Sequence, residues 1–215
     1  MEIKLSDDTY IPRRIFCIGK NYAKHVAEMK SAIPSSPVIF CKPSTSLVPP
    51  GEDVHYPAHG TSLHYEAEIV VLIGKEGKAI SSDEAVDFIS GLSLGLDLTM
   101  RDIQNELKTK GHPWETSKAF DESAPVGEFA PLSKVGDLEA IGFRCYVNDE
   151  LRQDGNSSNM IFPITRLITS LSEIWQLLPG DLIYTGTPEG VGELSKGDSV
   201  RVEGEAFGAF QWKIV

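Results

Sequence analysis

The chain has 215 residues, of which 41% are hydrophobic and 24% charged, and this length is enough to bury a full core without crosslinks. Its 31 acidic residues outnumber its 20 Lys and Arg, so the formal net charge is −11. This acidity argues against partners such as nucleic acids or anionic membranes, because both require a basic surface. No run of about 18 apolar residues is present, so no membrane-spanning helix is predicted.

The beginning of the chain, residues 1–10, mixes Glu, Lys and Asp and contains no apolar run of the kind found in signal peptides. We therefore expect a cytoplasmic protein. Three cysteines, Cys17, Cys41 and Cys145, lie within apolar segments. An odd number in such surroundings predicts reduced core residues and not a disulfide framework.

Short apolar segments separated by Gly and Pro recur along the chain and are typical of modest strands. They predict strands at residues 15–18, 38–41, 69–73, 92–96, 143–147, 182–184, 199–202 and 207–214. The pair Asn148-Asp149 lies between two such segments and predicts a tight hairpin turn.

Four segments have the spacing of helices, at residues 21–30, 82–89, 99–108 and 163–178. Thr99 and Asp102 are spaced as a capping box at the start of the third. Pro163 suits the first turn of the fourth, whose apolar residues recur every three or four positions until Pro179-Gly180 ends it. Without an internal repeat or linker, residues 1–215 are predicted to form one β-rich domain of the α+β class.

The most informative segment is residues 64–73, where His-Tyr-Glu-Ala-Glu precedes an apolar run. Side chains alternate along a strand, so Glu66 and Glu68 are expected on the same face, where they repel unless a cation lies between them. Asp97 follows the predicted strand at 92–96 and offers a third carboxylate, and such oxygens suit a hard divalent ion. The alternative is a solvated strand edge, since most glutamates are exposed.

The histidines suggest two further kinds of site. His55, His59 and His64 lie within ten residues, but they lack the spacing of known zinc signatures, which favours surface loops. His25 and Glu28 are three residues apart on a predicted helix, so the carboxylate can orient the imidazole and raise its basicity toward water. A surface ion pair is the alternative for this second pair.

Two later features carry weaker signals. Lys118 precedes a loop rich in Pro and Gly, where a lysine is usually a solvated charge. Residues 186–192, Gly-Thr-Pro-Glu-Gly-Val-Gly, follow a predicted strand but lack the Lys-Ser/Thr pair of a phosphate-binding P-loop. The backbone amides of this loop and the Thr187 hydroxyl could still hold a carboxylate or an oxyanion.

Several motifs occur in a fixed order along the chain. The first half contains Gly19-Lys20-Asn21-Tyr22-Ala23-x-His25-x-x-Glu28, Lys42-Pro43-Ser44 and His64-Tyr65-Glu66-x-Glu68. The second half contains Gly95-Leu96-Asp97-Leu98-Thr99-x-Arg101-Asp102, Trp114-x-x-x-Lys118 and Tyr184-Thr185-Gly186-Thr187-Pro188-x-Gly190-Val191-Gly192. Together they resemble the fumarylacetoacetate hydrolase family, and most closely its short, single-domain acylpyruvate hydrolases and oxaloacetate decarboxylases.

The resemblance implies a fold and a set of site residues. The family's fold is a mixed β-sandwich roll, mainly β, with a few peripheral helices, and its members usually form homodimers. The resemblance assigns a divalent ion, with Mg²⁺ our expectation and Mn²⁺ or Ca²⁺ as alternatives, to Glu66, Glu68 and Asp97. It assigns catalytic roles to His25, Glu28 and Lys118, and substrate binding to Lys20, Arg101, Gln104 and Thr187. Lys20 stands where many relatives have arginine, and because lysine cannot form a bidentate contact with a carboxylate, substrate binding is expected to differ there.

The resemblance also implies a reaction on a small 2-oxo acid with a β-carbonyl. The first hypothesis is hydrolysis of 3-acylpyruvates to pyruvate and a carboxylic acid through a metal-bound pyruvate enolate, with the ion acting as a Lewis acid. The alternative is oxaloacetate decarboxylation or keto–enol tautomerisation at the same metal site, which needs no attack by water. A metal-stabilised binding protein without activity is disfavoured, because the acids, the base and the lysine are all present.

Overall fold

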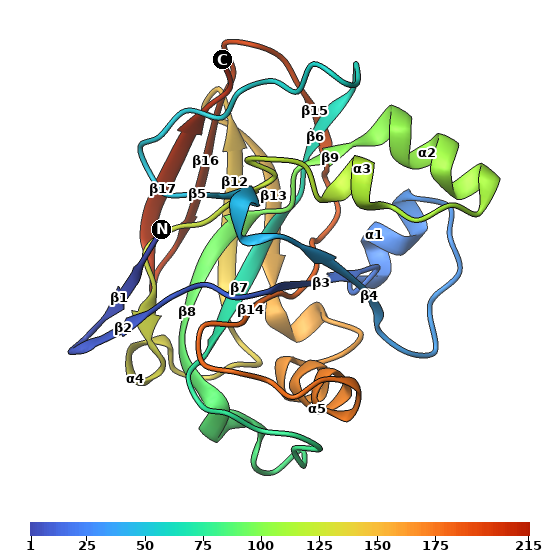
Figure 1. Ribbon diagram of the computed structural model, residues 1–215. Helices are drawn as coiled ribbons and strands as arrows, with labels where there is room; N and C mark the ends of the chain where they lie inside the picture. Colours follow the sequence, from blue (N-terminus) through green and yellow to red (C-terminus); the bar gives the residue numbers. More distant parts are fainter.

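The computed structural model describes residues 1–215, and strands dominate it (Figure 1). A six-stranded mixed sheet lies at its centre in the order β11-β8-β7-β14-β3-β4. In that order the strands are Ala130–Pro131, Ile89–Leu96, Ala67–Ile73, Leu182–Tyr184, Ile15–Gly19 and Val38–Lys42. Only β14 and β3 run parallel; the other neighbouring pairs are antiparallel.

A second, antiparallel sheet packs against the first and has the order β13-β12-β16-β17. Its strands are Glu150–Asn156, Gly142–Val147, Ser199–Gly204 and Gly208–Lys213. Asn148 and Asp149 connect β12 to β13, and their φ angles of 51° and 64° are the left-handed values that a two-residue type I′ turn requires. The predicted hairpin is therefore confirmed.

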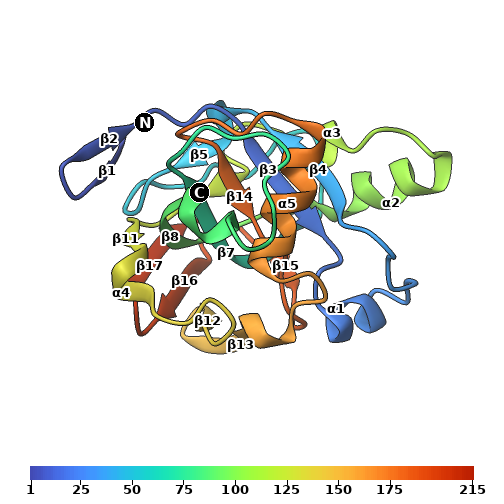
Figure 2. The same cartoon turned by 90° about the horizontal axis from the view of Figure 1, so that it is seen from below.

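Smaller elements surround these two sheets. One three-stranded sheet, β15-β6-β9, comprises Gly192–Leu194, Leu63–Tyr65 and Thr99–Met100. Two strand pairs are β1-β2, Ile3–Leu5 and Asp8–Tyr10, and β10-β5, Ala124–Pro125 and Leu47–Val48. The α-helices α1 to α5 are Ala23–Glu28, Arg101–Lys110, Glu115–Lys118, Leu132–Val135 and Ile164–Ile174. The 3-10 helices η1 to η3 are Ser44–Ser46, Ala85–Phe88 and Ser157–Asn159. Both ribbon views place α2 and α3 next to each other near the edge strand β4, with α1 on the same side of the molecule (Figures 1 and 2).

The core lies on both faces of β7. Ile69, Val71 and Ile73 belong to a cluster of 35 buried residues, which the second sheet and α5 complete. Val70 and Leu72 point to the other face, into a cluster of 11 buried residues that the β1-β2 pair covers. Because both faces are buried, the sequence of β7 is a continuous apolar run instead of an alternating one. The predicted mainly β fold of the α+β class, with peripheral helices, is confirmed.

All eight predicted strands are present, but the helix predictions need correction. The segment at 82–89 is only a 3-10 helix, η2, and Ile89 already begins β8. The helix predicted at 163–178 ends at Ile174, because Trp175 is extended and stacks its ring 5.2 Å from that of Phe16. Pro163 is its N-cap and not part of its first turn. The helix predicted at 21–30 is shortened to α1.

The predicted capping box at Thr99 and Asp102 is wrong. The helix α2 begins at Arg101, because Thr99 and Met100 pair with β6 as the short strand β9. The Thr99 hydroxyl donates a hydrogen bond to the Asp97 carbonyl oxygen at 3.2 Å. The Asp102 carboxylate accepts from the backbone N–H of Thr61 at 2.8 Å, outside the helix. Tertiary pairing has thus displaced the local helix signal by two residues.

The cysteines differ in their surroundings. Cys17 and Cys145 are buried, as predicted, whereas Cys41 is exposed. The prediction for Cys41 is wrong because β4 lies at the edge of the six-stranded sheet, where a side chain that alternates outward meets no neighbouring layer. All three cysteines are free thiols. No helix of the structure combines the length and the apolar character that crossing a membrane requires.

Candidate active site

Three carboxylates meet where β7 begins and β8 ends. The antiparallel register pairs Glu68 with Gly95, so Asp97, just beyond β8, lies beside residues 66–68. The backbone N–H of Asp97 donates to the Glu66 carbonyl oxygen at 2.8 Å. Ligand oxygens of Glu66, Glu68 and Asp97 lie within 4.8 Å of one another. Their exposed fractions of 6%, 1% and 2% exclude the alternative of a solvated strand edge. Glu66 lies between β6 and β7, so alternation along one strand does not explain its direction.

Buried cations surround two of these acids. Arg101 Nη2 lies 2.5 Å from Glu66 Oε1, and Lys118 Nζ lies 2.9 Å from Glu66 Oε2. Lys118 Nζ also contacts Asp97 Oδ2 at 2.5 Å, and Lys42 Nζ lies 2.8 Å from Asp97 Oδ1. Although burial opposes the change, Lys118 and Arg101 hold the pKa of Glu66 well below its ordinary value.

Glu68 has a different environment, because no side-chain cation contacts it. Its only hydrogen bond comes from the backbone N–H of Gly186, at 2.7 Å. Gly186 has φ of 99°, and a Cβ atom there would approach Asn21 Cβ to 2.6 Å, so this donor requires glycine. Burial, followed by repulsion from Asp97 and Glu66, raises the pKa of Glu68 well above its ordinary value.

These residues fit a hard divalent ion. Asp97 Oδ1 is buried and accepts no hydrogen bond, since its contact with Lys42 is an ion pair without hydrogen-bond geometry. Glu68 carries a buried carboxylate that no cation compensates. Three convergent carboxylates are the ligands that Mg²⁺, Mn²⁺ and Ca²⁺ prefer, and an ion among them would satisfy both groups.

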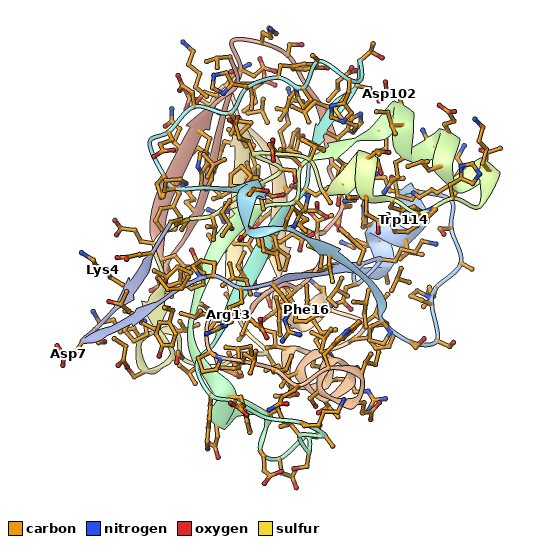
Figure 3. All side chains as sticks on the ribbon, viewed as in Figure 1. Lys4, Asp7, Arg13, Phe16, Asp102 and Trp114 are labelled. Atoms are coloured by element: carbon orange, nitrogen blue, oxygen red, sulfur yellow. The ribbon has the colours of Figure 1, made fainter.

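A cavity of about 190 Å³ opens next to Glu66, between α1, α2, α3 and the loop after β3. Six of the predicted site residues line it: Lys20, His25, Glu66, Arg101, Gln104 and Lys118. Sequence reasoning missed the other side chains on its wall, which are Met29, Ser31, Phe40, Asn105, Lys108 and Trp114. Figure 3 shows Trp114 on the side of α2 and α3 that faces α1.

His25 and Glu28 form a pair on α1. His25 Nδ1 lies 3.1 Å from Glu28 Oε2, and the His25 side chain is only 7% exposed. Glu28 Oε1 accepts in turn from the backbone N–H of Gly190 at 3.2 Å, which ties α1 to the glycine-rich loop. The alternative of a surface ion pair does not fit a histidine buried in the cavity wall. With Nδ1 engaged by Glu28, Nε2 is the nitrogen free to exchange a proton with a ligand.

A row of polar side chains runs along one face of α2. Arg101 Nη1 donates to Gln104 Oε1 at 2.7 Å, and Lys108 Nζ donates to the same oxygen at 3.0 Å. Both donors share one acceptor, so the amide nitrogen of Gln104 remains a free donor. Lys108 also lies over the Trp114 ring, 5.5 Å from its centroid. The i, i+3, i+7 spacing of this row is visible in the sequence and is the signal that identifies Lys108.

Two further residues take structural positions around the site. The Thr187 hydroxyl donates to the Ala67 carbonyl oxygen at 2.8 Å and accepts from Gln153 at 2.9 Å. Its proton is therefore already used to hold the start of β7, although the Thr187 backbone N–H has no acceptor within the chain. Lys42 donates to the Ser123 carbonyl oxygen at 3.0 Å as well as facing Asp97. Its sequence signals were its place at the end of an apolar strand and in the Lys42-Pro43-Ser44 motif, and neither indicated a contact with Asp97.

The three clustered histidines lie apart from this site. His55 contacts Glu122 at 3.1 Å, and His59 Nε2 lies 2.9 Å from the Thr116 carbonyl oxygen. His64 is partly buried on β6, and burial and the nearby Arg101 lower its pKa. They share no ligand cluster, so the structure offers no support for the zinc hypothesis.

Glu66 of the buried carboxylate cluster and His25 of the histidine–glutamate pair line one cavity, and this arrangement is that of a metal-dependent enzyme that moves protons. Comparison with known proteins identifies its class. Residues 14–215 match the family described as fumarylacetoacetate (FAA) hydrolase C-terminal, and the chain belongs to this family. The predicted family and its sandwich-type fold are confirmed.

The relatives that it resembles have named activities. Oxaloacetate tautomerase FAHD1, mitochondrial, from Mus musculus is 45% identical and covers 94% of this chain and 91% of its own. Oxaloacetate tautomerase YcgM from Escherichia coli is 41% identical, over 90% of this chain and 89% of its own. The crystal structure of fumarylpyruvate hydrolase from Pseudomonas aeruginosa, in complex with Mn²⁺ and pyruvate, superimposes with a TM-score of 0.95 at 36% identity, covering 100% and 95%.

Proposed function

We propose that this protein is a divalent-metal-dependent hydrolase that cleaves a carbon–carbon bond of 3-acylpyruvates, giving pyruvate and a carboxylic acid. The observation that carries the proposal is that His25, which Glu28 holds through Nδ1, lines the same cavity as Glu66. The similarity to a fumarylpyruvate hydrolase supports it. Glu66, Glu68 and Asp97 would hold the ion, which when bound supplies a Lewis acid for the oxygens of the 2-oxo acid.

The chain's own residues account for the proton transfers. His25 Nε2 takes a proton from a water molecule while the water oxygen forms a bond to the acyl carbonyl carbon, and Glu28 stabilises the resulting imidazolium. The bond between that carbon and C3 of the pyruvyl group then breaks. Its electron pair passes to the pyruvyl group as an enolate while the carboxylic acid forms. The fixed charges of Lys118 and Arg101 stabilise this enolate until the His25 imidazolium returns its proton to C3. Lys20, Gln104 and the Thr187 backbone N–H are the proposed contacts for the substrate's oxygens.

A second candidate is oxaloacetate keto–enol tautomerisation, with decarboxylation as a related reaction. The relatives that are 45% and 41% identical carry the name oxaloacetate tautomerase, which favours this candidate. The reaction moves one proton between C3 and the 2-oxo oxygen and needs no water. The same cavity therefore accommodates it, with Lys118 and Arg101 stabilising the enolate.

Three finer properties complete the proposal. We propose Mg²⁺ as the resident ion because of its availability, with Mn²⁺ and Ca²⁺ able to replace it at carboxylate ligands. We propose that residues 1–215 form one catalytic domain that assembles as a homodimer, as the family resemblance implies. A cytoplasmic location is also proposed, because all three cysteines are free thiols, as is usual in reducing compartments.

The test is steady-state turnover of acetylpyruvate and of oxaloacetate, with Mg²⁺ and after EDTA. His25→Ala is expected to lower hydrolysis of acetylpyruvate by about 10²- to 10⁴-fold, because the base that activates water is lost. Glu28→Gln should lower the rate of acetylpyruvate hydrolysis by a smaller factor, because His25 itself is retained. His55→Ala is the matched control, since the His55 side chain is 75% exposed and outside the cavity.

Full hydrolysis by His25→Ala would show that water is activated elsewhere. A wild-type enzyme that converts oxaloacetate rapidly but leaves acetylpyruvate intact would replace the first function with the second.

A further inference from the structure

A second cavity, which the proposed proton transfers do not use, lies along the outer edge of β4. We call it the edge cavity, and its volume is about 310 Å³. Residues 38–41 of β4 form one wall, and residues 112–115, which lead from α2 into α3, form the other. The site cavity, which Glu66 and His25 line, shares Phe40, Trp114 and Lys118 with it. The two cavities therefore meet at these three side chains.

The strand that forms the edge cavity has an unusual sequence for its position in the sheet. Edge strands commonly carry charged residues, because charges prevent pairing with other chains. β4 reads Val-Ile-Phe-Cys over residues 38–41 before its first charge at Lys42, and its outer edge has no partner strand (Figure 1). Cys41 is exposed, and the three apolar residues before it are only half-buried. The fold thus leaves apolar surface uncovered beside the candidate site, which favours an apolar ligand.

An aromatic pair and a lysine connect this surface to the acids. The rings of Phe40 and Trp114 lie 6.0 Å apart between centroids and are tilted by 60°. Lys118 Nζ lies 5.1 Å from the centroid of the Phe40 ring, and the same atom contacts Asp97 Oδ2 at 2.5 Å. One ammonium group therefore lies between the carboxylate cluster and the aromatic pair. A 2-oxo acid bound at the acids would reach Phe40 and Trp114 with the next few carbon atoms of its chain.

The charged groups of the two cavities decide what kind of chain fits each. The site cavity contains Lys20 and Lys108, from which an alkyl chain would remove water without offering a hydrogen bond. In the edge cavity, Lys118 is already paired with two acids. Glu115 lies on the wall of the edge cavity and is exposed, so it disfavours a second carboxylate there. An uncharged chain is the ligand that the edge cavity suits.

We propose that the edge cavity binds the acyl chain of the substrate and that Phe40 and Trp114 set a preference for an apolar chain. The inference rests on the proposed function and narrows its substrate class to 3-acylpyruvates with an alkyl chain beyond the acyl carbonyl, such as hexanoylpyruvate. The acyl carbonyl itself remains in the site cavity, which His25 lines. Acetylpyruvate, whose acyl group ends in a methyl group, leaves the edge cavity unfilled.

The first test is calorimetric binding, with Mg²⁺ present, of two 2-oxo acids that lack a β-carbonyl and are not cleaved. 2-Oxononanoate has the carbon skeleton of hexanoylpyruvate, and 2-oxopentanoate has that of acetylpyruvate. Each buried methylene strengthens binding about fourfold, so four more methylenes in a cavity open to solvent should strengthen it about 10- to 100-fold. Cys41→Trp, which fills the edge cavity, should remove most of this preference. Leu151→Trp should keep it, because Leu151 is 51% exposed and lines neither cavity.

Cys41 also reports occupancy of the edge cavity directly, because it lines this cavity and the other two cysteines are buried. Partial burial raises the pKa of the Cys41 thiol, so alkylation by iodoacetamide is followed at about pH 8.5, where more thiolate forms. 2-Oxononanoate at ten times its Kd should slow alkylation about tenfold, since only the free protein reacts. 2-Oxopentanoate at ten times its own Kd should leave the rate unchanged, and Cys41→Ala gives the background.

Two results of this labelling would overturn the proposal. Equal alkylation with and without saturating 2-oxononanoate would show that its chain lies elsewhere. Alkylation that is slow without any ligand and becomes fast on dilution of the protein would show that a second copy of the chain covers the edge cavity.

Turnover separates the subsite from the proposed function. KM for hexanoylpyruvate should lie about 10- to 100-fold below that for acetylpyruvate at a similar kcat, because the chain contributes equally to ground and transition states. If 2-oxononanoate binds more tightly and protects Cys41 but no acylpyruvate is cleaved, the subsite stands and the proposed reaction fails. If both acylpyruvates are cleaved but the two probes bind equally, the proposed function stands and the subsite is wrong.

Discussion

Glu66 and Glu68 provide a pair of matched substitutions with opposite expected effects. Both are buried carboxylates, two residues apart, and replacement by Gln removes one negative charge with little change of shape. Glu66 contacts Arg101 and Lys118, whereas Glu68 contacts no cation and accepts one backbone hydrogen bond. In the absence of divalent ions, Glu68→Gln should therefore stabilise the protein and Glu66→Gln should destabilise it.

The magnitudes follow from the burial of the charges. An uncompensated buried carboxylate costs several kcal/mol, of which the Gly186 hydrogen bond offsets a part, so Glu68→Gln should gain about 1–3 kcal/mol. Its amide oxygen can still accept from Gly186. Glu66→Gln leaves Arg101, which is 8% exposed, without its anion and should cost about 3–5 kcal/mol. For a chain of this length these values correspond to a Tm rise of roughly 5 °C and a fall of roughly 10 °C.

The assay is thermal and urea unfolding of wild type and both variants, first in EDTA and then during a titration with Mg²⁺ or Mn²⁺. Binding to the folded state alone stabilises wild type by about 2.7 kcal/mol at an ion concentration of 100 times Kd. Both variants should lose most of this response, because each lacks one of three carboxylate ligands. The sign of the change in EDTA and the loss of the ion response are independent readouts.

The result that refutes this reasoning is a fall in Tm for Glu68→Gln as large as that for Glu66→Gln in EDTA. Glu68 would then be held by interactions that its environment does not reveal. A full response to Mg²⁺ in either variant would place the ion elsewhere.

Three further outcomes are expected. Lys42→Met leaves Asp97 with Lys118 as its only cationic partner and should cost about 3–5 kcal/mol in urea unfolding. Because the pKa of Glu66 is lowered from an ordinary 4.5, the stability that it contributes is complete above pH 4.5 and is lost as the pH falls toward the lowered value, so Glu66→Gln should show a weaker acid dependence in EDTA than wild type. Asp149→Gly should stabilise by about 0.5–1 kcal/mol, because φ of 64° suits glycine, whereas Asn148→Gly should not, since the Asn148 side chain bonds to Ser199 and Asp198.

Each of these has a contrary result. If Lys42→Met leaves the free energy of unfolding unchanged, Lys118 alone compensates the charge of Asp97. If the stability of wild type and of Glu66→Gln falls equally with decreasing pH, other carboxylates are responsible for acid unfolding. If Asp149→Gly destabilises the protein, the contact of Asp149 with Arg201, at 3.9 Å, contributes more to stability than relief of the left-handed backbone does.

Local patterns in the sequence were sufficient for the strands. The eight segments are three to eight residues long and rich in apolar residues, and no competing helix pattern overlaps them. The hairpin at Asn148-Asp149 was equally local, because its turn type depends on two φ angles. The ends of the helices could not be predicted from local sequence. Pairing of Thr99 with β6 and stacking of Trp175 on Phe16 ended helical structure where periodicity predicted that it continues.

In the candidate site, too, some features were predictable from the sequence and others depended on the tertiary structure. The sequence alone indicated its acids, the His25–Glu28 pair and the family, because spacing and motif order are properties of the chain. Tertiary structure decided that Glu66 has two cationic partners and Glu68 none, and it gave Lys42 and Lys108 their places at the site. The physical reason is that the free energy of a charged side chain depends on how deeply it is buried and on which charges lie around it. The fold supplies those from segments as distant as residues 20, 42, 66, 97 and 118.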